Sequence, residues 1–165
     1  MPMTTRTLLP AFTALVATPA LEHPAVTFES VPFGRAADQN VMGIPVAFCN
    51  AIAFDLADVR RLIFVSGQLA VDEHEQLVGI GDVGAQTEQV LKNIQTYLER
   101  LGGSLADVVQ VAVFVKDMSD LRAIHEARLR AFSPPYPTST LVAVSAFVHP
   151  DALIEISAIA AIKNE

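Results

Sequence analysis

Apolar residues recur at helical spacing in two stretches of the chain and dominate five other stretches that are typical of β-strands. The strand-like stretches are residues 46–56, 60–71, 108–115, 139–148 and 152–162. The first two are joined by a polar turn, so we expect them to pair as a hairpin. The elements follow one another in the order β-β-α-β-α-β-β.

The longer helix is expected between Asp82 and the Gly102-Gly103 pair. Asp82 can cap the N-terminus, and the glycines allow the left-handed backbone that ends a helix. The apolar residues at helical spacing are Val90, Leu91, Ile94, Leu98 and Leu101. These side chains are expected to belong to the core rather than to a cofactor site.

The shorter helix is expected to be capped by Asp117, Ser119 or Asp120 and to end near Phe132, before a proline-rich break. Two helices can cover only one face of the sheet, whereas the strands 108–115 and 139–148 are apolar on both faces. A large exposed apolar face is an association surface. The pattern alone therefore predicts an oligomer in which several subunits bury their second faces together.

The length of the chain suits one domain with a substantial core, which we place at residues 41–165 after an irregular extension of residues 1–40. The net charge of −7, with no offsetting run of Lys or Arg, would repel a phosphate backbone. Nucleic acid is therefore not an expected partner. The N-terminal apolar stretch is interrupted by Pro10 and is too short to span a bilayer, so no membrane partner is expected either.

The single cysteine, Cys49, excludes an intramolecular disulfide and fits a reducing compartment, so a cytoplasmic location is expected. The four histidines are scattered without metal-ligand spacing. Neither a phosphate loop nor a dinucleotide-binding fingerprint is present in the sequence. We therefore expect no metal and no cofactor.

Glu155 is the one acidic residue within the apolar stretch 152–162. In a strand it shares a face with Ser157 and Ile159. A carboxyl in such surroundings suits general acid/base chemistry. The pattern equally allows a structural carboxyl at a subunit rim that accepts a backbone hydrogen bond.

For three other polar residues the sequence gives a weaker indication of a functional role. His125 lies at the edge of the apolar face of the second helix, where a single histidine is more often packed or exposed than functional. Ser139 and Thr140 follow the proline-rich break at a strand start, where hydroxyl groups usually make local hydrogen bonds.

Three motifs in this order resemble the Rid (YjgF) family of reactive-intermediate deaminases. They are LIFVSGQLAVD (62–72), the long stretch 85–118, and PDALIEISAIAAI (150–162). The resemblance covers about residues 46–163. It implies an α+β fold, a chorismate-mutase-like two-layer sandwich of a mixed β-sheet with two helices on one face, assembled as a homotrimer with ligand sites in the clefts between subunits.

The resemblance also implies roles for individual residues. Glu155 falls at the position of the acid that directs the attacking water, and Gly67 belongs to a triplet that lines the cleft through its backbone. The remaining substrate-binding candidates are Ser139, His125, Phe48, Thr140 and Leu141.

The chain departs from the family pattern at the residues that bind the substrate. Ser139 stands where the family has an Arg that binds the substrate carboxylate, Leu141 replaces a frequent cysteine, and His125 replaces a frequent Asn. Loss of a charge-assisted bond would remove roughly 1.5–3 kcal/mol of binding. Carboxylate-bearing imines are therefore expected to bind poorly, unless His125 or Arg128 supplies the cation.

Two functions remain open from the sequence. The first is a hydrolase of the deaminase type that acts on an imine, an enamine or a related C=N compound. The alternative is a trimer that binds small molecules or protects proteins without catalysis, which the missing Arg favours.

Overall fold

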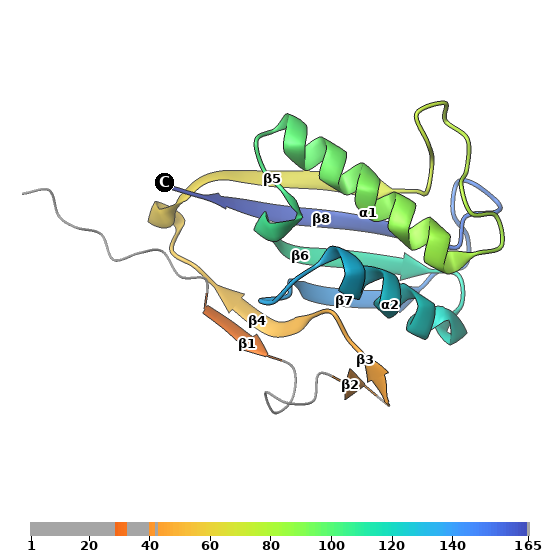
Figure 1. Ribbon diagram of the computed structural model, residues 1–165, viewed down its shortest axis with the longest axis horizontal. Helices are drawn as coiled ribbons and strands as arrows, with labels where there is room; N and C mark the ends of the chain where they lie inside the picture. The colour runs from red at the N-terminus through yellow and green to blue at the C-terminus, as the bar shows by residue number, and fades with distance from the viewer. Residues whose placement is uncertain (1–28, 33–39, 42, 165) are drawn as a thin grey trace, which may run out of the picture.

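A computed structural model describes residues 29–32, 40–41 and 43–164. Its main feature is a six-stranded mixed sheet with the strand order β1-β4-β7-β6-β8-β5 (Figure 1). The strands are β1 (Glu29–Pro32), β4 (Cys49–Ala53), β5 (Val59–Gln68), β6 (Val108–Val115), β7 (Thr138–Ala143) and β8 (Ile154–Lys163). A separate two-stranded sheet pairs β2 (Asn40–Val41) with β3 (Ile44–Pro45).

Two helices, α1 (Val83–Arg100) and α2 (Leu121–Ala131), lie on one face of the large sheet (Figure 1). The central strand β6 is parallel to β7 and antiparallel to β8, and β5 pairs antiparallel with β8. Two helices on one face of a mixed sheet confirm the expected α+β sandwich. The order β-β-α-β-α-β-β is also confirmed for the elements from β4 onward, which are linked in part by short 3-10 turns.

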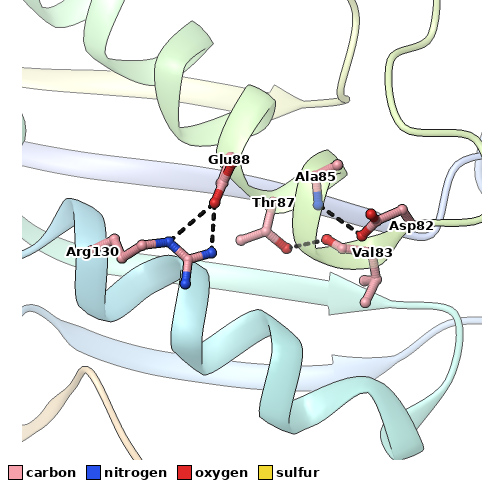
Figure 2. A network of polar contacts seen from close by, with 6 residues as sticks. All are labelled: Asp82, Val83, Ala85, Thr87, Glu88 and Arg130. Atoms are coloured by element: carbon pink, nitrogen blue, oxygen red, sulfur yellow. Dashed lines mark hydrogen bonds and ion pairs between the residues drawn. The ribbon is translucent and has the colours of Figure 1, made fainter.

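The start of α1 follows the expected capping chemistry. Asp82 accepts a hydrogen bond from the Ala85 backbone N–H at 3.0 Å, as Figure 2 shows. Gly102 has a φ of +80° just after the helix, which is the left-handed conformation that glycine adopts without strain. Leu101 differs from the expectation: it lies outside the helix and is 46% exposed, because the helical face ends at Leu98.

Polar contacts within α1 and between α1 and α2 also stabilise the helices. Thr87 is buried and donates its hydroxyl hydrogen to the Val83 carbonyl of the same helix (Figure 2). Arg130 of α2 donates to Glu88 of α1 on the surface, with 3.1 Å between Arg130 Nε and Glu88 Oε1 (Figure 2). The exposed ion pair aligns the helices but contributes little stability.

The core lies between the helices and the covered face of the sheet. Every second residue along the central part of β6 and of β8 points into this core, where it packs against the apolar stripe of α1. Its completely or almost completely buried members include Val90, Leu91, Ile94, Leu98, Val111, Val113, Val115, Ile154 and Ile156.

The opposite face of the sheet is apolar and open. Phe64 of β5 is 71% exposed, Val142 of β7 is 42% exposed, and Leu62 of β5 is 40% exposed. The predicted second apolar face is therefore present on the described chain. An association surface of this kind is what the sequence pattern indicated.

The predicted hairpin between residues 46–56 and 60–71 is wrong. β4 pairs with β1 and β7, whereas β5 pairs with β8 at the other edge of the sheet. Three strands separate β4 from β5, and a 3-10 turn at Leu56–Asp58 lies between them in the chain. Alternation along a strand marks its buried face but does not specify which strand it pairs with. Most of the proposed irregular extension, residues 1–40, lies outside the described residues, but Glu29–Pro32 within it forms β1, a regular edge strand of the large sheet.

Candidate functional site

Glu155 projects from β8 onto the open face of the sheet. It is directly opposite Phe114 of β6, which in turn is opposite Val142 of β7, so these three side chains form one row across the face. The residue is partly buried. Within residues 43–164 its carboxylate has no hydrogen-bond or ion-pair partner, which leaves its oxygens available to a water or ligand.

Gly67 of β5 lies directly against this carboxylate. A Cβ atom on residue 67 would overlap Glu155 Oε1 and would lie only 2.7 Å from Glu155 Cδ. The φ of Gly67 is not positive, so the restriction at this position is steric, and a side chain here would push the Glu155 carboxylate aside. The backbone of β5 can therefore approach the acid, and the two predicted site residues are in contact.

Strand β7 divides the other candidates between the two faces of the sheet. Ser139 and Leu141 pair with Val111 and Val113, whose side chains are buried beneath the helices. Thr140, between them, points to the open face like Glu155. Ser139 and Glu155 of one chain therefore lie on opposite faces of the sheet, and a single chain does not bring them together.

His125 lies on the helix-covered side of the sheet, as do Ser139 and Leu141. Its imidazole belongs to α2, is 6% exposed, and faces the ring of Phe48 with 6.1 Å between the ring centroids at a tilted angle. Its Nδ1 and the Ser139 hydroxyl are both buried, and neither has a hydrogen-bond partner in the described part of the chain. Burial and the nearby charge of Arg128 lower the pKa of His125 to about 4, so the ring is neutral at pH 7.

Arg128 follows His125 by one helical turn and is completely buried. Its Nη2 donates to the Ala47 carbonyl at 3.0 Å, whereas its Nε and Nη1 have no acceptor among the described residues. Burial lowers the pKa of Arg128 to about 10, which still leaves the guanidinium charged at pH 7. From the sequence, Arg128 was expected only as a possible replacement for the missing cation.

Gln86 is a positioning residue that sequence reasoning missed. This completely buried side chain donates to the carbonyls of Gly79 and Asp151 and accepts from the Leu153 N–H, at 3.2, 3.0 and 2.8 Å. It thereby fixes the segment that leads into β8 and Glu155. A glutamine within an amphipathic helix is indistinguishable from a surface residue until the fold shows what it faces.

The candidate site is therefore divided into two half-sites. Glu155, Gly67 and Thr140 lie on or beside the open face, and His125, Ser139, Leu141 and Phe48 lie on the helix side or at its edge. Within residues 43–164, no three His, Cys, Asp or Glu side chains are grouped as metal ligands. Neither α1 nor α2 is long and apolar enough to cross a membrane, and they are the α-helices that the structure describes.

Two helices on one face of a mixed sheet define the class of the protein as a small α+β two-layer sandwich. Residues 48–162 match the family described as Endoribonuclease L-PSP. The chain belongs to this family, which is also called the Rid or YjgF family.

Individual relatives give the same family. The chain is 40% identical over 100 residues to 3-aminoacrylate deaminase RutC of Acinetobacter baylyi. The aligned region covers 61% of this chain and 79% of the relative. Among solved structures it is similar to the Rid-family protein YyfB of Yersinia pestis, with a TM-score of 0.69 and 28% identity over 82% of this chain and 98% of that one. It is also similar to RidA of Psychrobacter sp. PAMC 21119, with a TM-score of 0.59 and 29% identity over 85% and 100% of the two chains.

Proposed function

We propose that this protein is a hydrolase of the deaminase type that acts on an imine, an enamine or a related C=N compound. The observation that carries the proposal is the Glu155 carboxylate, which lies against Gly67 with no protein partner in the described chain. The relative named 3-aminoacrylate deaminase supports the reaction class.

In this reaction an enamine first becomes its imine tautomer, and water then adds to the C=N carbon. Glu155 accepts a proton from that water and passes it to the nitrogen, which gives a carbinolamine. It then transfers the proton of the new hydroxyl group to the same nitrogen, so that the C–N bond breaks, the carbonyl forms and ammonia leaves. The overall change is one imine plus one water to one carbonyl compound plus one ammonia. No cofactor is required by this balance.

The complete site requires a second copy of the chain in this proposal. Glu155 and Ser139 lie on opposite faces of one sheet, so a cleft containing both residues needs two subunits. The open apolar face around Phe64 and Val142 is the surface through which the copies would associate. A homotrimer with three such clefts is the assembly we propose.

The test is Glu155→Gln, which keeps the size of the side chain and removes its basic function. Ammonia release from an imine generated in the assay should fall by about 10²–10⁴-fold, while the assembly measured by light scattering is unchanged. Glu99→Gln, an exposed acid-to-amide change on α1, is the matched control and should keep full activity. Unchanged turnover in Glu155→Gln would exclude this mechanism, and binding without turnover in the wild type would favour the non-catalytic alternative.

A further inference from the structure

Strand β5 is irregular at the point where it contacts Glu155. The register of β5 against β8 shifts there, so that Ser66 and Gly67 together oppose a single residue of β8, Ser157. Two residues opposite one form a β-bulge, which interrupts the regular ladder and redirects the local backbone. Gly67, the residue that lies against the Glu155 carboxylate, therefore belongs to a bulge.

The sheet by itself holds this bulge weakly. β5 is an edge strand of the described sheet, where its one neighbour is β8. In the same part of the chain a single register pair, Gln68 with Ile156, follows the bulge before β5 ends. A segment held by few contacts opens most easily. The position of Gly67 therefore depends on what holds the chain directly after Gln68.

Two amide side chains of α1 hold that part of the chain. Asn93 Nδ2 donates to the carbonyls of Leu69 and Val71, at 3.1 and 2.8 Å. Gln89, one helical turn earlier, donates to the Val71 carbonyl at 3.2 Å and to Asn93 Oδ1 at 2.8 Å. Each amide thereby uses both of its N–H hydrogens. The two side chains fasten the end of β5 to α1 as one unit.

The turn that follows has hydrogen bonds of its own. Asp72 Oδ1 accepts from the backbone N–H groups of His74 and Gln76, both at 2.9 Å. Val71 forms an isolated bridge with Leu77 across the turn. Because these bonds lie within the turn, the amides of α1 determine where the turn lies rather than how it folds.

Open space beside the turn allows its position to change. A cavity of about 450 Å³ lies between the turn and α1, and Gln89 and Asn93 form part of its lining. Ala70 is completely buried, so loss of the amides would reorient the peptide units on either side of it without detaching the turn. Water in the cavity can replace the lost hydrogen bonds. The amides should therefore matter more for geometry than for stability.

We propose that Asn93, supported by Gln89, is a positioning residue for the Glu155 site. It holds the chain two residues after Gly67 and so keeps the bulge against the carboxylate. The inference rests on the proposed function, in which Glu155 directs the attacking water. A displacement of about 1 Å can slow an enzyme reaction by roughly 10²-fold.

Asn93→Ala in the full chain is the first test. The kcat for ammonia release should fall by about 10–100-fold while KM changes by less than about 3-fold, because Asn93 acts on the acid rather than on the substrate. Thr96→Val is the matched control. Thr96 lines the same cavity, but its hydroxyl donates to the Lys92 carbonyl within α1. This control should keep both constants, and a wild-type kcat in Asn93→Ala would overturn the proposal.

A double variant separates positioning from a general loss of structure. If Asn93 acts through Glu155, adding Asn93→Ala to Glu155→Gln should slow the reaction by less than about 2-fold further. Two effects that multiply would show that Asn93 supports the reaction by another route, and the positioning role would be wrong.

Nuclear magnetic resonance provides a readout that does not need turnover. In Asn93→Ala the backbone amide resonance of Gly67 and the side-chain carboxyl resonance of Glu155 should both shift, whereas Thr96→Val should leave them in place. Unmoved resonances in Asn93→Ala would contradict the proposal. Shifted resonances together with full turnover in Glu155→Gln would refute the hydrolase mechanism and leave the positioning role intact.

A milder variant covers the case in which Asn93→Ala does not fold. Gln89→Ala removes one of the two hydrogen bonds to the Val71 carbonyl and the bond to Asn93 Oδ1. It should shift the Gly67 and Glu155 resonances by a measurable amount and lower kcat by about 3–10-fold. A folded Gln89→Ala chain with wild-type resonances and wild-type kcat would overturn the proposal in that case.

Discussion

The carboxylate of Glu155 and the backbone of Gly67 are in contact across neighbouring strands of the sheet, so closely that a Cβ atom at residue 67 would overlap the carboxylate and force it to move. This contact couples the conformation of the acid to the β5 backbone. It also explains why a glycine stands within a strand, where glycine is otherwise unfavourable.

Gly67→Ala should therefore destabilise the protein and displace the acid. The new methyl group overlaps Glu155 Oε1, the end of a flexible side chain that can turn away. We therefore expect a loss of up to about 1 kcal/mol in unfolding free energy and a fall in turnover of roughly 10²-fold. Urea unfolding and an ammonia-release assay measure the two effects.

The double variant Gly67→Ala/Glu155→Ala is the control for this contact. Removing the Glu155 carboxylate relieves the overlap, so the two substitutions should be clearly non-additive in stability. Activity should remain lost, because the acid is absent. If the two stability changes simply add, the contact does not determine the residue at position 67.

Gln86→Leu should destabilise the protein by about 2–4 kcal/mol. The substitution leaves the carbonyls of Gly79 and Asp151 and the Leu153 N–H without their partner. Asp151 and Leu153 lie just before β8, and Gly79 lies in the turn before α1. Thermal or urea unfolding measures the loss. Gln95→Leu on the exposed side of the same helix is the control, and an effect as large as that of Gln86→Leu would contradict the positioning role.

Stability should depend on pH through His125. Its pKa is about 4 in the folded protein and near 6.5 in the unfolded chain, so only the unfolded chain takes up the proton between these values. Unfolding free energy should therefore fall by roughly 1–3 kcal/mol as pH decreases from about 6.5 to about 4, with no further contribution below that range.

Urea titrations at a series of pH values provide the measurement. His125→Gln should flatten the profile across this interval, whereas His74→Gln, which replaces an exposed histidine, should leave it unchanged. A wild-type profile that is already flat would mean that His125 is protonated in the folded protein as readily as in the unfolded chain.

Phe64→Glu should interfere with the proposed assembly. The substitution places a charge in the middle of the open apolar face, and light scattering should show a shift from trimer towards monomer. Ile80→Glu is the control, because it changes a residue with 69% exposure in the turn before α1. A monomeric Phe64→Glu chain with full turnover would show that one chain contains the whole site.

The sequence by itself determined the elements from β4 onward, the face that the helices and central strands bury, and the position of Glu155 on β8, but it did not predict β1, β2 or β3. These properties follow from local periodicity, capping residues and turn chemistry, which are present in short stretches of chain. The family motifs added the two-layer sandwich, which the sheet order and helix placement confirmed.

Only the tertiary structure decided which strands pair and which side chains share an environment. The predicted hairpin was wrong because strand partners are chosen by long-range packing, and β5 packs beside β8 rather than β4. The same long-range packing enclosed Arg128 and His125 beneath residues 47–49 and placed Ser139 on the face opposite Glu155. No local pattern contains that information, since it depends on residues far apart in the chain meeting in space.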